Sequence, residues 1–142
     1  MEVRVAKSAG FCFGVKKAVE AVYQKLEDPF VHSAIYTYGP LIHNEEVVCD
    51  LEKKGVKVLH GEEDLEKLTE GIVVLRSHGV EKRIYDKLQE KGITIVDATC
   101  PFVKKIHQIV AKYSEEGYQI VVIGNDKHPE VEGIKGWCKT IP

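Results

Sequence analysis

Short apolar runs typical of strands alternate with amphipathic helical stripes along this chain of 142 residues. The predicted strands cover residues 3–6, 34–38, 56–59, 72–75, 93–96 and 118–123. The segments between them carry apolar residues at helical spacing, and several end in Lys-Gly or Glu-Gly just before the next strand. Strands that alternate with helices are typical of βα units, whose strands pair in parallel. The sequence therefore predicts an α/β fold of repeated βα units with mostly parallel sheets.

Two helix starts are marked by their residues. Asn44 can cap a helix that begins just after it, because its side-chain oxygen can accept from a free helix N–H group. Pro101 suits the first position of a helix, which makes Cys100 the expected N-cap residue. We expect the helix after Pro101 to bury the stripe Val103, Ile106, Val110 and Tyr113.

A Cys or a His stands at five expected strand-to-helix junctions: Cys12, His43, His78, Cys100 and His128. We expect His78 to open the helix that follows it. In an open α/β sheet such junctions gather at the carboxyl edge of the strands, where ligands bind. Residues more than a hundred positions apart are therefore expected to form one site. Two thiols and three imidazoles indicate a metal or cluster beside an anion.

The chemistry of these side chains supports that interpretation. A helix N-terminus favours the thiolate form of a cysteine, and the thiolate is the form that binds metals. Cys12 and Cys100 are therefore candidate metal ligands. Imidazoles beside free helix N–H groups can bind phosphate oxygens. His43, His78 and His128 are therefore candidates for an anion site. Taken singly, each residue can equally be a helix cap or an ordinary loop residue.

Glu130 is the best acid/base candidate. It is expected in the first turn of a helix, where a carboxylate is stabilised as the anion, so it needs a buried, ligand-filled pocket to hold a proton near neutral pH. The ordinary alternative is a favourable first-turn glutamate.

The remaining Cys and His residues are expected to have no role in the site. We expect Cys49 and Cys138 to be packed as small hydrophobic residues. His32, His60 and His107 are expected on polar or helical surface.

Composition excludes several classes of protein. The net charge of −2 leaves no basic excess for binding nucleic acid, and no apolar run approaches the length of a membrane span. The four Cys are widely spaced, and the first residues lack the apolar core of a signal peptide. We therefore expect a cytoplasmic protein with no nucleic-acid or membrane partner.

Five segments resemble those of a known family, in the family's order: residues 9–15 around Cys12, 38–44 ending in His43 and Asn44, 76–80 around His78, 97–103 around Cys100, and 124–131 around His128 and Glu130. Together they are similar to the LytB/IspH family of 4-hydroxy-3-methylbut-2-enyl diphosphate reductases. The resemblance runs from the first predicted strand almost to residue 142.

This resemblance implies a reaction and a set of roles. The family reductively removes the allylic hydroxyl of (E)-4-hydroxy-3-methylbut-2-enyl diphosphate, which yields isopentenyl and dimethylallyl diphosphate in the last step of the non-mevalonate isoprenoid pathway. Its [4Fe-4S] cluster is held by three cysteines, and one iron stays open to the substrate. By motif, Cys12 and Cys100 would bind the cluster, His43, His78 and His128 would bind diphosphate, and Glu130 would help to deliver a proton. Ferredoxin or flavodoxin would supply electrons.

The resemblance also implies an architecture of three α/β lobes. Residues 1–97 would form the first lobe and residues 98–142 the beginning of the second, while the third lobe and its ligand cysteine are not in this sequence. The chain is about half the family's usual length, so we expect it to be the amino-terminal part of an enzyme and inactive by itself.

Two other functions fit the residues. A metal-dependent phosphate-ester hydrolase would use Cys12, Cys100 and one or more histidines as mixed ligands of zinc or iron. A non-catalytic module would bind a phosphoryl ligand with the histidines and helix N-termini alone.

Overall fold

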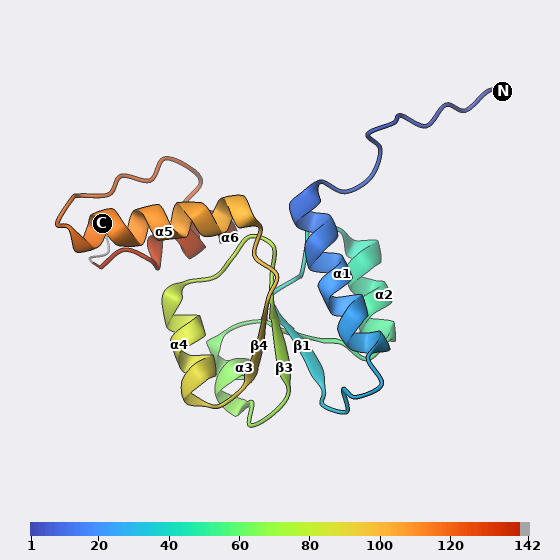
Figure 1. The fold of residues 1–142 in the computed structure, drawn as a ribbon, viewed down its shortest axis with the longest axis horizontal. Coiled ribbons are helices and arrows are strands. Elements are labelled where there is room, and N and C mark those ends of the chain that lie inside the picture. Colours follow the sequence, from blue (N-terminus) through green and yellow to red (C-terminus); the bar gives the residue numbers. More distant parts are fainter. Residues whose placement is uncertain (140–142) are drawn as a thin grey trace.

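A single parallel sheet organises the chain in the computed structural model, which describes residues 1–139. The elements in order are α1 (Phe13–Glu27), β1 (Ile35–Tyr38), α2 (Glu45–Lys53), β2 (Lys57–Leu59), α3 (Glu62–Lys67), β3 (Ile72–Leu75), α4 (Lys82–Glu90), β4 (Thr94–Asp97), α5 (Pro101–Glu115) and α6 (Pro129–Lys135). The strand order is β2-β1-β3-β4, and every neighbouring pair is parallel (Figure 1). The prediction of an α/β fold is confirmed.

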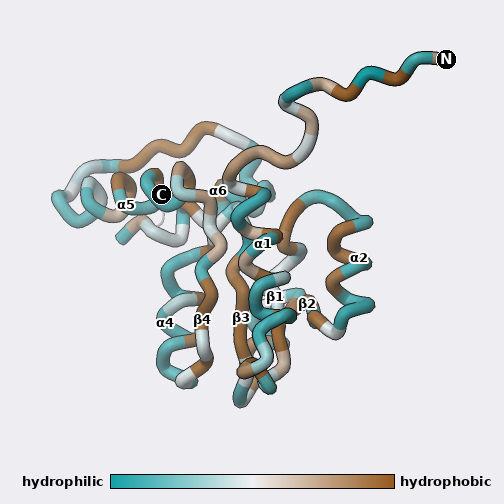
Figure 2. Tube along the Cα trace, turned by 45° about the vertical axis from the view of Figure 1, so that its right-hand side comes forward, coloured by the Kyte–Doolittle hydropathy of each residue, from teal (hydrophilic) through white to brown (hydrophobic). Residues whose placement is uncertain are grey.

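Helices cover both faces of this sheet. Because successive side chains of a strand point to opposite faces, Val74 joins the core under α1 and α2, whereas Val73 and Leu75 join the core under α3 and α4. All four residues of β3 are buried, as expected for a central parallel strand, and Figure 2 shows this strand as hydrophobic along its length. Burying one such side chain stabilises the fold by roughly 1.5–3 kcal/mol.

The predicted helix caps that begin α2 and α5 are present. The Oδ1 atom of Asn44 accepts from the backbone N–H of Val47 at 3.0 Å, which satisfies one free donor of α2. Pro101 is the first residue of α5, and Cys100 is its N-cap residue. These caps fix where the two helices start at the carboxyl edge of the sheet.

Two predicted strands are not formed among the described residues. Residues 3–6 and 118–123 are extended chain without sheet pairing, and Val121 and Ile123 are 76% and 95% exposed. A strand needs a neighbour to bind its backbone N–H and C=O groups, and no described strand pairs with either segment. Figure 2 shows the second of these segments as an uncovered hydrophobic stretch between α5 and α6.

The buried face of α5 is rotated by about one residue from the prediction. Its buried residues are Val103, His107, Val110 and Ser114. Ile106 and Tyr113, which were expected in the core, are 39% and 42% exposed. The expectation of an exposed His107 is therefore wrong. The helical repeat of 3.6 residues allows either Ile106 or His107 to share a face with Val103.

Within residues 1–139, no helix combines the length and the apolar character that a membrane span requires.

Candidate active site

The crevice between β1 and β3 is the switch point of the sheet. The chain leaves β1 through α2 toward β2 on one side, and it leaves β3 through α4 toward β4 on the other side (Figure 1). Ligands of open α/β sheets bind outside the carboxyl ends of the strands at such a point. His43 lies in the loop after β1 and His78 in the loop after β3, so the topology brings these two residues to the same crevice.

The structure brings three histidines together there. The ring centroids of His43 and His78 are 4.3 Å apart. The ring of His128 lies 6.0 Å from His43 and 6.1 Å from His78. The trio thus joins the loops after β1 and β3 to the start of α6, across 85 positions of sequence from His43 to His128. We call these three residues the histidine cluster.

His78 differs from the prediction in its local position. Helix α4 begins at Lys82 with Glu81 as its N-cap residue, so His78 does not open the helix but lies in the preceding loop. Gly79 has a φ of +75°, a conformation that favours glycine, and this turn separates His78 from the helix.

The charge state of His78 follows from its surroundings. Burial and, to a smaller extent, the neighbouring His43, Arg76 and His128 together lower the pKa of His78 to about 4. The ring is therefore neutral near pH 7. A bound anion would offset both effects, because negative charge favours the imidazolium form.

His128 and Glu130 form one hydrogen-bonded unit at the start of α6. His128 is the N-cap residue, and its Nδ1 atom accepts from the backbone N–H of Glu130 at 3.2 Å. This bond leaves Nε2 of His128 to bind a ligand. Glu130 is half-buried in the first turn of the helix, as predicted, two residues from the histidine cluster.

The two cysteines of interest begin neighbouring helices. Cys12 and Cys100 are the N-cap residues of α1 and α5, and neither side chain makes a capping hydrogen bond. A Cβ atom placed on Gly14 would lie 2.6 Å from Sγ of Cys100. The Cys100 thiol therefore lies against the first turn of α1, two residues from Cys12, in space that exists because residue 14 has no side chain.

Ser77 connects the loops of this site and was missed by sequence reasoning. Its backbone N and its Oγ both donate to the carbonyl oxygen of Leu41, at 3.3 Å and 3.4 Å. Its own carbonyl oxygen accepts from the backbone N–H of Cys100 at 2.9 Å. One buried serine thus links the loops that carry His43, His78 and Cys100. The only signal in the sequence is a small polar residue directly before His78.

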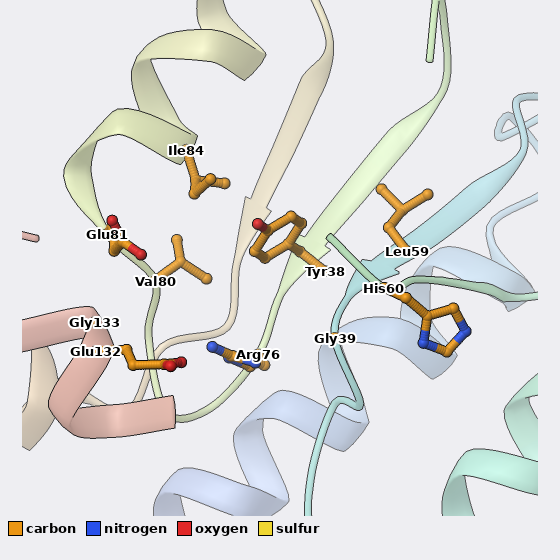
Figure 3. A pocket seen from close by; sticks show the side chains of 10 residues that line it. All are labelled: Tyr38, Gly39, Leu59, His60, Arg76, Val80, Glu81, Ile84, Glu132 and Gly133. Atoms are coloured by element: carbon orange, nitrogen blue, oxygen red, sulfur yellow. The ribbon is translucent and has the colours of Figure 1, made fainter. Parts of the chain in front are cut away.

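Arg76 was also missed, although it lies in the same motif. Figure 3 shows its side chain in a pocket of about 160 Å³, opposite Glu132 of α6. Its Nε atom donates to the carbonyl oxygen of Gly79 at 3.3 Å, and burial lowers the pKa of the guanidinium. Its charge also acts on the histidine cluster, because Arg76 is one of the groups that lower the pKa of His78.

The other cysteines differ from each other. Cys49 is exposed and lines an open pocket beside His43, so the expectation that it is packed is wrong. α2 has only Leu51 fully buried, and Cys49 lies on another side of this helix. Cys138 is half-buried, and burial raises the pKa of its thiol, in keeping with the predicted packing role.

The described part of the chain does not complete a metal site. No three His, Cys, Asp or Glu side chains among residues 1–139 are placed to bind one metal ion. A mixed site of Cys12, Cys100 and a histidine, as the hydrolase alternative requires, is therefore not found in this range.

Known proteins resemble the chain in sequence. The family described as LytB protein matches residues 3–141. The 4-hydroxy-3-methylbut-2-enyl diphosphate reductase of Thermoanaerobacter sp. strain X514 is 52% identical over 97% of this chain and 48% of its own length. The protein of the same name from Clostridioides difficile strain 630 is 49% identical over 98% of this chain and 48% of its own length. The chain spans about half the length of these relatives.

Solved structures resemble the fold over a similar range. One, described as (E)-4-hydroxy-3-methyl-but-2-enyl diphosphate reductase and the terminal enzyme of the non-mevalonate pathway, matches with a TM-score of 0.78 and 41% identity over 95% of this chain and 46% of its own. The E-1-hydroxy-2-methyl-but-2-enyl-4-diphosphate reductase of Plasmodium falciparum matches with a TM-score of 0.82 and 32% identity, over 92% of this chain and 40% of its own.

Proposed function

This chain belongs to the LytB protein family, and we propose that it is the amino-terminal part of a 4-hydroxy-3-methylbut-2-enyl diphosphate reductase. The observation that carries the proposal is the histidine cluster at the sheet's switch point, on the same edge as two thiols at helix N-termini. The reaction replaces the allylic hydroxyl by hydrogen, consumes two electrons and two protons, and releases water. We use "complete reductase" for this chain together with the remainder that its relatives carry.

The histidine cluster would hold the diphosphate. Three imidazoles within about 6 Å of one another offer several N–H donors to phosphate oxygens. The guanidinium of Arg76 behind His78 adds positive potential, and the N-terminus of α6 adds the favourable end of a helix dipole. These groups would fix the substrate so that its hydroxyl faces the thiol-bearing helices.

Diphosphate binding should therefore be coupled to proton uptake. His78 is neutral in the free protein with a pKa of about 4, and a bound anion should raise this pKa. Binding then takes up protons at pH 6, so affinity for inorganic pyrophosphate should increase as the pH falls from 7 toward 5. Isothermal titration calorimetry in two buffers with different ionisation enthalpies measures this uptake.

A His78→Gln variant is the matched control for that uptake, because it keeps a polar group but cannot titrate. It should lose most of the proton uptake measured at pH 6. Proton release on binding, or the same uptake in the His78→Gln protein, would contradict the assignment of His78.

Cys12 and Cys100 would supply two ligands of an iron–sulfur cluster. Neither thiol makes a capping bond, the Cys100 thiol lies against Gly14 two residues after Cys12, and soft thiolates are the ligands that such clusters prefer. A further ligand would come from the remainder of the complete reductase. When bound, the cluster would supply the electrons and a Lewis-acidic iron for the substrate oxygen.

Glu130 would donate the proton to the leaving hydroxyl. Its backbone N–H donates to Nδ1 of His128, so Glu130 belongs to the same helix start as one of the residues that would bind the diphosphate. A carboxylic acid in that position can protonate the departing oxygen, which then leaves as water rather than as hydroxide.

Further parts of the proposal follow from the family. We propose ferredoxin or flavodoxin as electron donor, residues 1–97 and 98–142 as one lobe and the beginning of the next, and a reducing cytoplasm, where cluster thiolates survive.

The test is to purify the complete reductase anaerobically and to assay it with a strong one-electron donor. It should contain iron and acid-labile sulfide, and it should convert (E)-4-hydroxy-3-methylbut-2-enyl diphosphate into the two isoprenoid diphosphates. Bound zinc or iron without sulfide, together with phosphate release, would point to the hydrolase instead. Pyrophosphate binding without metal or turnover would point to the binding module.

A further inference from the structure

His107 is buried at the junction of three elements that carry site residues. It lies on the inner face of α5, and its side chain is 1% exposed. Neither ring nitrogen has a hydrogen-bond partner among residues 1–139. A buried polar ring without partners is unfavourable compared with an apolar side chain of similar size. Packing alone therefore does not account for a histidine at this position.

One glycine makes room for this ring, and a second glycine borders it. A Cβ atom on Gly79 would lie 2.5 Å from Cε1 of His107, far inside contact distance. A Cβ atom on Gly133 would lie 3.6 Å from Nε2. Gly79 directly follows His78, and Gly133 follows Glu130 by three residues on α6. The ring of His107 thus fills the space between the loop of one site residue and the helix of another.

An aromatic ring closes the remaining side. The indole of Trp137 stacks on His107 with centroids 5.2 Å apart and an angle of 20° between the planes. The Nε1 atom of Trp137 donates to the carbonyl oxygen of Val80 at 2.9 Å, which ties the chain after α6 to the loop after His78. His107 and Trp137 together hold this loop and α6 at a fixed separation.

We propose that His107 is a positioning residue that sets the distance between His78 and Glu130, an inference that rests on the proposed function. The flat ring fits a slot that two glycines and an indole define, and α5 anchors that slot to Cys100 at its N-terminus. Burial lowers the pKa of His107 to about 4, so the ring is neutral at the pH of turnover. It therefore does not repel the ammonium group of the neighbouring Lys104. His107 touches neither substrate nor cluster in this role.

The test compares His107→Leu with His107→Gln in the complete reductase. Leucine has a branched side chain that does not fit the flat slot, whereas glutamine keeps a planar, neutral, polar end. We expect His107→Leu to lower kcat per cluster about tenfold or more, because misplaced groups lose transition-state alignment, and also to raise KM, because the released loop carries His78. Iron content should stay within twofold of the wild type. His107→Gln should recover most of the lost kcat.

A second measurement does not depend on turnover. NMR titration of the histidine Cε1 protons reports the pKa of His78 in the protein without substrate. Release of the loop in His107→Leu should solvate His78 and raise its pKa from about 4 toward the ordinary histidine value. A purely structural role would reduce thermal stability but would leave this titration unchanged.

These measurements separate the two proposals. A wild-type protein without reductase activity would contradict the proposed function, and the His78 titration would then decide on the role of His107. Wild-type kcat per cluster in His107→Leu, or an unchanged His78 pKa in that variant, overturns the positioning role. If His107→Leu does not fold, His107→Ala replaces it, because alanine empties the slot without adding bulk. The kcat should again fall severalfold, and a wild-type kcat would overturn the role.

Discussion

Cys12→Ser and Cys100→Ser should each remove most of the iron and acid-labile sulfide from the anaerobically purified complete reductase and abolish its turnover. A serine hydroxyl is a hard and weakly acidic ligand, so it cannot replace a thiolate on iron–sulfur iron. Both cysteines are N-cap residues without a capping hydrogen bond, and the Cys100 thiol lies against Gly14 in the first turn of α1. Iron and sulfide analysis, the visible absorption of the cluster and an activity assay measure the effect.

Cys49→Ser is the matched control, because its thiol is exposed and lies on α2. This variant should keep cluster content and turnover close to the wild type. Normal iron content in both Cys12→Ser and Cys100→Ser would contradict the assignment of these residues as cluster ligands. An equal loss of iron in all three variants would contradict it as well.

Glu130→Gln should retain the cluster and lose kcat by about a hundredfold or more, the usual contribution of a general acid. The amide keeps the size and polarity of the carboxyl group but cannot supply a proton. The backbone bond from residue 130 to His128 does not depend on the side chain, so the N-cap of α6 should persist. Steady-state kinetics with the complete reductase measures kcat and KM separately.

His43→Ala serves as the comparison for Glu130→Gln. It removes one donor from the histidine cluster, which binds ground state and transition state alike, so it should mainly raise KM, with some loss of rate from misplaced substrate. A wild-type kcat in the Glu130→Gln enzyme would contradict proton donation by Glu130 and would leave it the role of an ordinary first-turn glutamate.

The central strands could be predicted because each of them is decided by local sequence. β3 is a continuous apolar run, and Asn44 and Pro101 mark the starts of α2 and α5 by their own chemistry. Residues 118–123 have the same apolar character, yet they remain unpaired in the described structure. Strand formation depends on a partner elsewhere in the chain, and local apolar character does not supply that partner.

Two members of the histidine cluster could be anticipated because parallel topology sends every βα junction to one edge, which brings His43 and His78 together. His128 follows residues 118–123, which pair with no described strand, so this rule does not account for its place beside them. The position of His107 could not be anticipated in this way. Val103 and Val110 belong to the inner stripe under either phase of α5, whereas the burial of His107 instead of Ile106 depends on the space beside Gly79, which lies in the loop after β3.

The contact between Gly14 and Cys100 also limits how this protein can change during evolution. Any larger residue at position 14 would displace the Cys100 sulfur, so we expect a substitution at position 14 to be tolerated only with a compensating change around Cys100, 86 positions away. Recombination that exchanged only one of these two segments between distant relatives would place the first turn of α1 from one parent against the start of α5 from the other. Their contact at Gly14 would then be poorly matched. Hybrids should therefore survive best when both segments come from the same parent.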